Sequence, residues 1–268
     1  MLSGTIIFSL YGTFYGPAMA PEWHITSQNK ALTMSQLNQW GQPIGDALPG
    51  WTPRPHPEHV TLEGHYCRVV PFSLDHASSL YAAHAKAPDP RSWTWLFQSP
   101  PASEADYQAL ARQMADSRDP LFYTVIAKDT GQPVGTCALM RIDPASGIVE
   151  VGHVHFSPAL QRTRMSTEAH WLLMRYVFET LGYRRYEWKC DSLNQPSRHA
   201  AIRLGFQFEG IFRQALVYKG RTRDTAWFSV IDSEWPRQDQ VFSAWLNADN
   251  FDQAGRQLRS LAAIRGNN

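Results

Sequence analysis

The sequence predicts an α/β fold: a mixed sheet that is antiparallel in its N-terminal half, with helices on both faces. Three strand-like segments, at 121–129, 133–143 and 148–156, are separated by turn residues. Helical and strand-like patterns then alternate from 165 to 191. With 43% hydrophobic residues in 268, including 10 Trp and 13 Phe, the chain has ample material for a core. Its length suits one domain of about 150–200 residues with extensions, or two small domains.

The first 58 residues show no hydrophobic periodicity and are predicted to be an irregular arm. The segment 41–59 is dense in glycine and proline. Residues 1–33 are expected to be a disordered or non-native leader, with Met34 as an alternative start. The apolar stretch 6–20 ends in Ala-x-Ala like a signal peptide, but no Lys or Arg precedes it, which favours the leader interpretation.

An ordered domain is predicted over 59–236. A β-rich run covers 66–72, and Ser73 and Ser103 are N-cap candidates for helices over 73–85 and 103–117. After the three strands, an apolar stripe from 165 to 181 ends at Gly182. Strict alternation over 184–191 predicts a half-buried strand.

The remaining elements complete the sheet and a tail. Asn194 is expected to cap a helix that runs to Leu204 and stops at Gly205. Strands are expected over 208–218 and 225–232, and the tail 237–268 is predicted to form amphipathic helices packed on the domain.

Charge and cysteine content restrict the classes of partner. The net charge is +1, so no basic field favours nucleic acid, and the basic-aromatic runs at 183–189 and 218–224 are typical of amphipathic strands. The three cysteines, Cys67, Cys137 and Cys190, lie far apart and form no zinc or redox pair, which fits a reducing cytoplasm. No apolar run reaches the roughly 18–20 residues of a membrane span. The sequence is compatible with a homodimer and with a monomer.

The segment Gln161-Arg162-Thr163-Arg164-Met165-Ser166-Thr167 joins a predicted strand to a predicted helix. The unpaired N–H groups and the dipole of a helix start attract anions, and the small residues of this segment let a phosphate approach the backbone. An ordinary β–α turn with solvated arginines is the alternative.

Residues 66–235 resemble the GNAT superfamily of N-acetyltransferases, in particular the branch of the ribosomal-protein N-terminal acetyltransferases. The coenzyme A loop of that family reads Q/R-x-x-G-x-G/A, which this chain matches at Gln161 and loosely at Ser166. Glu150 stands eleven positions earlier, where some members carry a general base. The segment "NQPSRHAAIRLGF" from Asn194 matches the family's N-x-x-[AS]…L-G-F helix.

The resemblance implies a sheet splayed between its fourth and fifth strands, with acetyl-CoA bound in the gap. The residues expected to bind it are His155, Phe156, Gln161, Arg162, Thr163, Arg164, Met165, Ser166, Thr167 and Asn194. Arg164 replaces the usual glycine. It is tolerable there at a negative φ, pointing outward, where it can add a contact to phosphate.

Acetyl transfer to an amine needs a proton acceptor and stabilisation of the leaving thiolate. The resemblance assigns these roles to Glu150, acting through a water, and to the Ser197 hydroxyl, because Ala201 occupies the position of the family's tyrosine. A surface carboxylate and a helix cap are the alternatives for the two residues.

Strand alternation puts Glu150 on the face opposite His153 and His155. His153 is an alternative base. His153 and His155 have no third ligand at useful spacing, so no metal is expected. Trp93, Trp95 and Phe97 are candidates for an aromatic wall of the acceptor site.

The predicted function is therefore an acetyl-CoA-dependent N-acetyltransferase. Its acceptor is a primary amine, either a protein N-terminus or a small molecule. A non-catalytic acyl-CoA-binding module is the alternative.

Overall fold

The computed structural model describes residues 36–266, which divide into two compact units between Trp51 and Thr52. In the first unit, β1 (Gln36–Leu37) and β2 (Pro43–Ile44) pair as an antiparallel hairpin. The Asn38 side chain accepts hydrogen bonds from the N–H groups of Trp40 and Gln42 and so shapes the turn. This hairpin was not predicted. The predicted leader, residues 1–33, lies outside the described residues.

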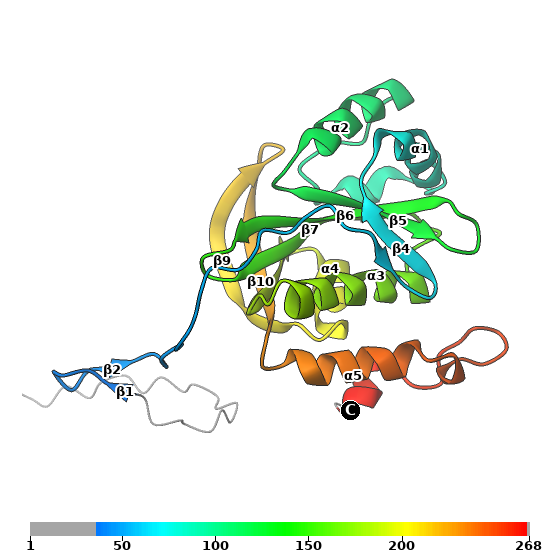
Figure 1. Cartoon of the computed structure of the whole chain (residues 1–268). Helices are drawn as coiled ribbons and strands as arrows, with labels where there is room; N and C mark the ends of the chain where they lie inside the picture. Colours follow the sequence, from blue (N-terminus) through cyan, green and yellow to red (C-terminus); the bar gives the residue numbers. More distant parts are fainter. Residues whose placement is uncertain (1–35, 267–268) are drawn as a thin grey trace, which may run out of the picture. The chain divides into compact units, whose positions relative to one another are not determined.

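The second unit is built on one eight-stranded sheet of order β3-β4-β5-β6-β7-β8-β10-β9 (Figure 1). All neighbours pair antiparallel except β7 and β8, which are parallel. The predicted mixed, mostly antiparallel sheet is therefore confirmed. The strands are β3 (Leu62–Glu63), β4 (Cys67–Pro71), β5 (Leu121–Ala127), β6 (Pro133–Asp143), β7 (Ile148–Phe156), β8 (Arg185–Asp191), β9 (Gln207–Tyr218) and β10 (Arg221–Ile231).

Helices cover both faces of the sheet. On one face lie α1 (Ala77–Ala85) and α2 (Glu104–Asp116), with the short η1 (Leu74–His76) and η2 (Pro90–Trp93) around them. On the other lie α3 (Arg164–Arg175), extended by a π-helical turn (Tyr176–Thr180), and α4 (Gln195–Arg203). The predicted N-caps Ser73, Ser103 and Asn194 all accept from a backbone N–H of their own first turn. No helix within 36–266 is long and apolar enough to cross a membrane.

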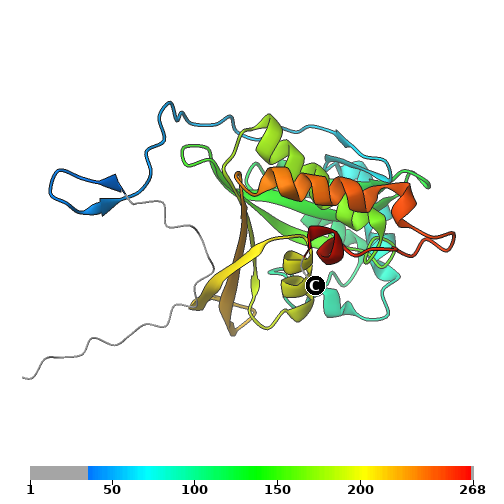
Figure 2. The same cartoon turned by 90° about the horizontal axis from the view of Figure 1, so that it is seen from below.

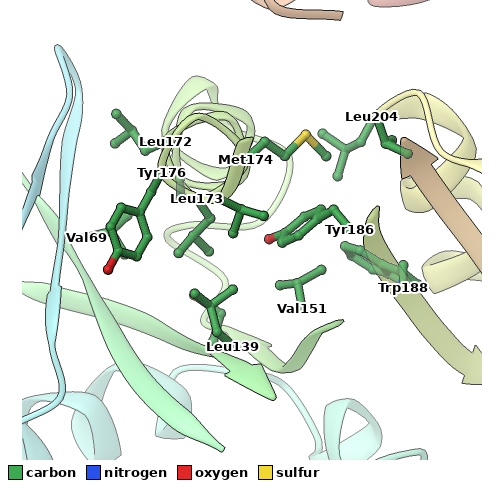
Figure 3. Close-up of a cluster of buried hydrophobic side chains, with 14 of the residues drawn as sticks. Val69, Leu139, Val151, Leu172, Leu173, Met174, Tyr176, Tyr186, Trp188 and Leu204 are labelled. Carbon is green, nitrogen blue, oxygen red and sulfur yellow. The ribbon is translucent and has the colours of Figure 1, made fainter. Parts of the chain in front are cut away.

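The larger core lies between the sheet and α3 (Figure 3). Leu139, Val151 and Tyr186 from three strands meet Leu173 and Met174 from the helix, and all five are buried. The tail adds α5 (Trp235–Leu246), η4 (Ala248–Asn250) and α6 (Leu261–Arg265), with α5 running beside α3 (Figure 2).

Two indoles fasten α5 to the domain. Trp235 stacks on Phe178 at 5.2 Å between ring centroids. The Trp171 indole N–H donates to Asp239 at 2.8 Å. The tail therefore packs on the domain, as its apolar spacing predicts.

A buried carboxylate ties α3 to the turn before β4. Glu168 is 1% exposed and accepts the backbone N–H groups of His65, Tyr66 and Cys67 at 2.6–2.8 Å. A Cβ on Gly64 would lie 2.5 Å from the Glu168 carboxyl carbon, so this turn is closed around the carboxylate. No periodicity or motif in the sequence predicts the contact.

A β-bulge at His153 overturns the predicted faces of β7. Thr136 of β6 pairs with His155 and Ala138 with Gly152, so β7 carries one extra residue there, and His153 has a φ of 47°. The His155 ring stacks on His84 of α1, and the His153 ring contacts Phe122. Both histidines therefore share the α1–α2 face with Glu150, because the extra residue shifts the alternation by one.

Candidate functional site

The parallel strands β7 and β8 separate partway along their length. Their pairing runs from Ile148–Arg185 to Val151–Trp188 and stops there. Beyond this point β7 stays paired only with β6, out to Phe156, and β8 only with β10, out to Asp191. The facing backbone edges of the two strands are thus unpaired in the described part of the chain. Such an edge accepts an extended group in the way a sheet accepts another strand.

The start of α3 follows directly after β7 and offers three unpaired amides. Arg162 adopts φ 60°. The Thr163 N–H donates to the Leu160 carbonyl and the Ser166 N–H to the Thr163 hydroxyl. Within residues 36–266, no protein acceptor receives the N–H groups of Arg162, Arg164 and Met165. Amides clustered at a helix start are suited to bind phosphate.

Several side chains expected to touch the cofactor instead build this loop. The Gln161 amide donates to the Phe156 carbonyl at 2.7 Å, and the Ser166 hydroxyl donates to the Thr163 carbonyl at 2.7 Å. Thr167 is 1% exposed and accepts from Arg203 at 3.0 Å, so its side chain faces the interior. The predicted cofactor contact of Thr167 therefore gains no support from its side chain.

Arg164 begins α3 at a helical, negative φ, as the replacement of glycine requires. Its guanidinium does not point outward as predicted. It lies between two rings, 4.8 Å from the Tyr66 centroid and 4.5 Å from that of Phe251. The tail returns past α5 to supply Phe251, so the arginine is held beside the loop by cation–π contacts.

The start of α4 lies beside the separated end of β8. Asn194 caps the helix by accepting from the Ser197 N–H at 3.1 Å, so the cap is Asn194 and not Ser197. The Ser197 hydroxyl accepts from the Trp188 indole N–H at 2.9 Å. A hydroxyl has one proton and two lone pairs, so Ser197 can still donate its proton, and the Cys190 sulfur lies within reach of it.

Glu150 belongs to a charge network on the α1–α2 face. Its Oε2 lies 2.5 Å from Arg141 and 3.0 Å from the Lys189 Nζ, and its side chain is 4% exposed. Lys189 also pairs with Glu187 at 2.7 Å. Arg141 and Lys189 therefore both contact the same carboxylate oxygen of Glu150. The expectation that Glu150 is a simple surface carboxylate is wrong, because its side chain is buried and already paired with two cations.

Two stacked imidazoles lie beyond the bulge. The His155 and His84 rings are 3.8 Å apart and 4° from parallel, and the His155 Nε2 lies 3.2 Å from the Ser92 hydroxyl. Burial lowers the pKa of His84 to about 4. Burial, and then His84, lower the pKa of His155 to about 3. Both rings are therefore neutral near pH 7.

His153 faces a hollow between the sheet and α2. The hollow is lined by Trp93, Leu96, Gln98, Tyr107, Leu110, Met114, Phe122, Thr136, His153 and His155. Burial, and to a smaller extent Arg141, lower the pKa of His153 from 6.5, so the ring is neutral near pH 7 and able to accept a proton. No group of three metal-binding side chains occurs in the part of the chain described.

The separated strands and the helix start together indicate a class of protein. An open edge between two separated parallel strands, next to unpaired amides at a helix start, is the layout that the resemblance implies for acetyl transfer. Residues 68–207 match the family model described as "Acetyltransferase (GNAT) domain", which covers about half of the chain. The chain belongs to the GNAT acetyltransferase family.

Solved structures and a curated relative are also similar to this chain. A GCN5-related N-acetyltransferase from Brucella melitensis is 50% identical, with a TM-score of 0.80, covering 82% of this chain and 100% of that one. A probable acetyltransferase of the GNAT family from Chromobacterium violaceum is 40% identical with a TM-score of 0.68, covering 73% and 98%. The uncharacterized N-acetyltransferase p20 of Bacillus licheniformis is 32% identical over 117 residues. That match spans 42% of this chain and 63% of the relative's length.

Proposed function

We propose that the protein transfers an acetyl group from acetyl-CoA directly to a primary amine, with both substrates bound together. The observation that carries this proposal is the separation of β7 and β8 beyond Val151 and Trp188, beside the α3 start. The amides of Arg162, Arg164 and Met165 would hold the pyrophosphate. The arm would follow the open edge of β7 near His155 and Phe156, with Asn194 on its other side.

The chemistry would be divided between two sides of the gap. On the α4 side, the Ser197 hydroxyl would donate its proton as a hydrogen bond to the departing thiolate. On the α1–α2 face, we propose His153 as the proton acceptor in preference to Glu150, because His153 is neutral and faces the hollow. The amine belongs either to a protein N-terminus, as in the ribosomal-protein branch, or to a small molecule.

The test combines binding and turnover. Calorimetric titration with acetyl-CoA should show one site per chain, and thiol release should follow when an amine panel is added. Tight binding with no thiol release on any amine would make the protein an acyl-CoA-binding module. If acetyl-CoA does not bind, both functions are excluded.

Ser166→Asp should weaken acetyl-CoA binding by more than about tenfold at low salt. Ser166 stands in the first turn of α3, where an acidic residue favours the helix, so the fold should tolerate the change. The new carboxylate would, however, repel the pyrophosphate next to it. Because salt screens that repulsion, the loss should shrink as ionic strength rises. The measurement is the dissociation constant at two salt concentrations.

Arg164→Gly is the matched comparison at the same loop. It restores the family's usual residue but removes a guanidinium held between two rings, at a cost of roughly 0.5–1 kcal/mol for exposed cation–π contacts. Acetyl-CoA affinity should fall less than about tenfold. If Arg164→Gly is the more damaging variant, or Ser166→Asp binds normally, the pyrophosphate does not lie on this helix start.

A further inference from the structure

The β9–β10 hairpin closes over the α1–α2 face beyond the end of β8. At its turn, the Lys219 ammonium donates to the Trp93 carbonyl at 2.6 Å, and the Tyr218 ring meets the Phe97 ring at 5.9 Å. The Tyr218 hydroxyl donates to Asp191, the last residue of β8, at 2.8 Å. The hairpin thus covers part of the sheet face on which His153 lies.

Arg223 is a buried cation of the β9–β10 hairpin. It is 8% exposed, and its guanidinium lies 5.6 Å from the Phe97 ring and 5.9 Å from the Tyr218 ring. Its Nε donates to the Thr225 hydroxyl at 3.2 Å. Among residues 36–266 no carboxylate pairs with it, and its terminal nitrogens donate to no protein acceptor. A buried guanidinium without an anion is costly, so this one is expected to serve a bound group.

The neighbouring carboxylates are already engaged. Asp191 accepts from the Tyr218 hydroxyl and from the Leu193 N–H, and Asp224 accepts from the Gln214 N–H at 2.7 Å. Ion pairs farther along the same face join three carboxylates to three cations: Glu150, Glu187 and Glu209 with Arg141, Lys189 and Arg185. Arg223, by contrast, has no carboxylate partner among the residues that the structure describes.

We propose that Arg223 binds a carboxylate of the acceptor, so that the substrate is a primary amine that also carries a carboxylate. The inference rests on the proposed function and names its substrate class. A planar guanidinium matches a carboxylate with two parallel hydrogen bonds, and the flanking Phe97 and Tyr218 rings keep water away from the pair. Lys219 and Arg221 at the rim would add attraction for an anionic acceptor and repel a polycationic one.

The experiment compares matched acceptors that differ only in charge. Glycine, β-alanine and glycylglycine are each paired with the corresponding C-terminal amide. For the best-accepted pair, kcat/KM should favour the carboxylate by at least about tenfold, within the range of a charged hydrogen-bonded contact. Arg223→Gln should raise KM for the carboxylate about 10–100-fold and change the amide less than about threefold. Arg223→Lys should keep part of the preference. Arg213→Gln, an exposed arginine on β9, is the control and should change neither.

Each outcome decides one way. Equal kcat/KM for carboxylate and amide in the unaltered protein would overturn the inference and leave the proposed function standing. The inference would also be overturned if Arg223→Gln lowered kcat equally for the carboxylate acceptor and its amide while Tm stayed unchanged. The guanidinium would then act on the transferred acetyl group and not on the carboxylate. If no amine turns over, calorimetry of the carboxylate acceptors with coenzyme A present still decides. Binding that Arg223→Gln abolishes supports the site, and its absence in the unaltered protein overturns it.

Discussion

His153→Gln should lower kcat for acetyl transfer by about 10²–10⁴-fold, the usual contribution of a positioned general base. His153 stands on the bulge of β7, two residues past Val151, the last residue of β7 paired with β8, and lines the hollow beside Trp93 and Phe122. Glutamine keeps a polar side chain of similar size but cannot take a proton from the amine. Acetyl-CoA affinity should change little, because the α3 start is untouched.

The pH dependence gives this prediction a sign. His153 must be neutral to accept a proton, and burial together with Arg141 lowers its pKa below 6.5. With both substrates saturating, kcat of the unaltered protein should hold down to about pH 6.5. It should fall only as the pH passes through the lowered pKa of His153. In His153→Gln this acidic limb should be lost along with most of the rate.

Glu150→Gln is the competing variant. It removes the carboxylate that Arg141 and Lys189 share, so a loss of stability is expected, although Lys189 keeps Glu187. The acidic limb of the kcat profile should survive. If a folded Glu150→Gln loses the limb while His153→Gln keeps it, Glu150 is the base and the assignment to His153 is wrong.

Most of the fold follows from local signals in the sequence. Ser73, Ser103 and Asn194 are the caps that they were predicted to be, and Gly182 and Gly205 end their helices at φ 66° and 96°. Caps and stops depend on the nearest few residues, so they can be read without the rest of the chain. The separation of β7 and β8 came from family resemblance, since it depends on how distant segments meet.

The wrong predictions concern side-chain directions that depend on one inserted residue or on a partner far away in the sequence. Strict alternation along β7 failed because the bulge at His153 adds a residue that no composition signal marks. The prediction that the Arg164 side chain points outward is wrong because Phe251, far along the chain, packs against its guanidinium. The stacked pair His84 and His155 joins α1 to β7, a contact between distant segments. Long-range contacts of this kind leave no periodicity to detect.

Glu168 is such a case, and its replacement should have the largest effect on stability. Glu168→Ala should lower the free energy of unfolding by about 4 kcal/mol or more. The carboxylate accepts three backbone N–H groups, and hydrogen bonds to a charged group contribute roughly 1.5–3 kcal/mol each. For a domain of this size, about 2–4 °C of Tm accompanies each kcal/mol, so Tm should fall by roughly 8–15 °C.

Two controls separate lost hydrogen bonds from lost charge. Glu63→Ala removes a neighbouring carboxylate that is 58% exposed and pairs with Lys128 at 3.5 Å, and it should cost less than about 1 kcal/mol. Glu168→Gln keeps one acceptor oxygen but turns an amide N–H₂ toward the backbone donors, so its Tm should lie between those of the other two variants. If Glu168→Ala melts like Glu63→Ala, the N–H groups of His65, Tyr66 and Cys67 find water instead. The carboxylate would then not be what holds the turn before β4 to α3.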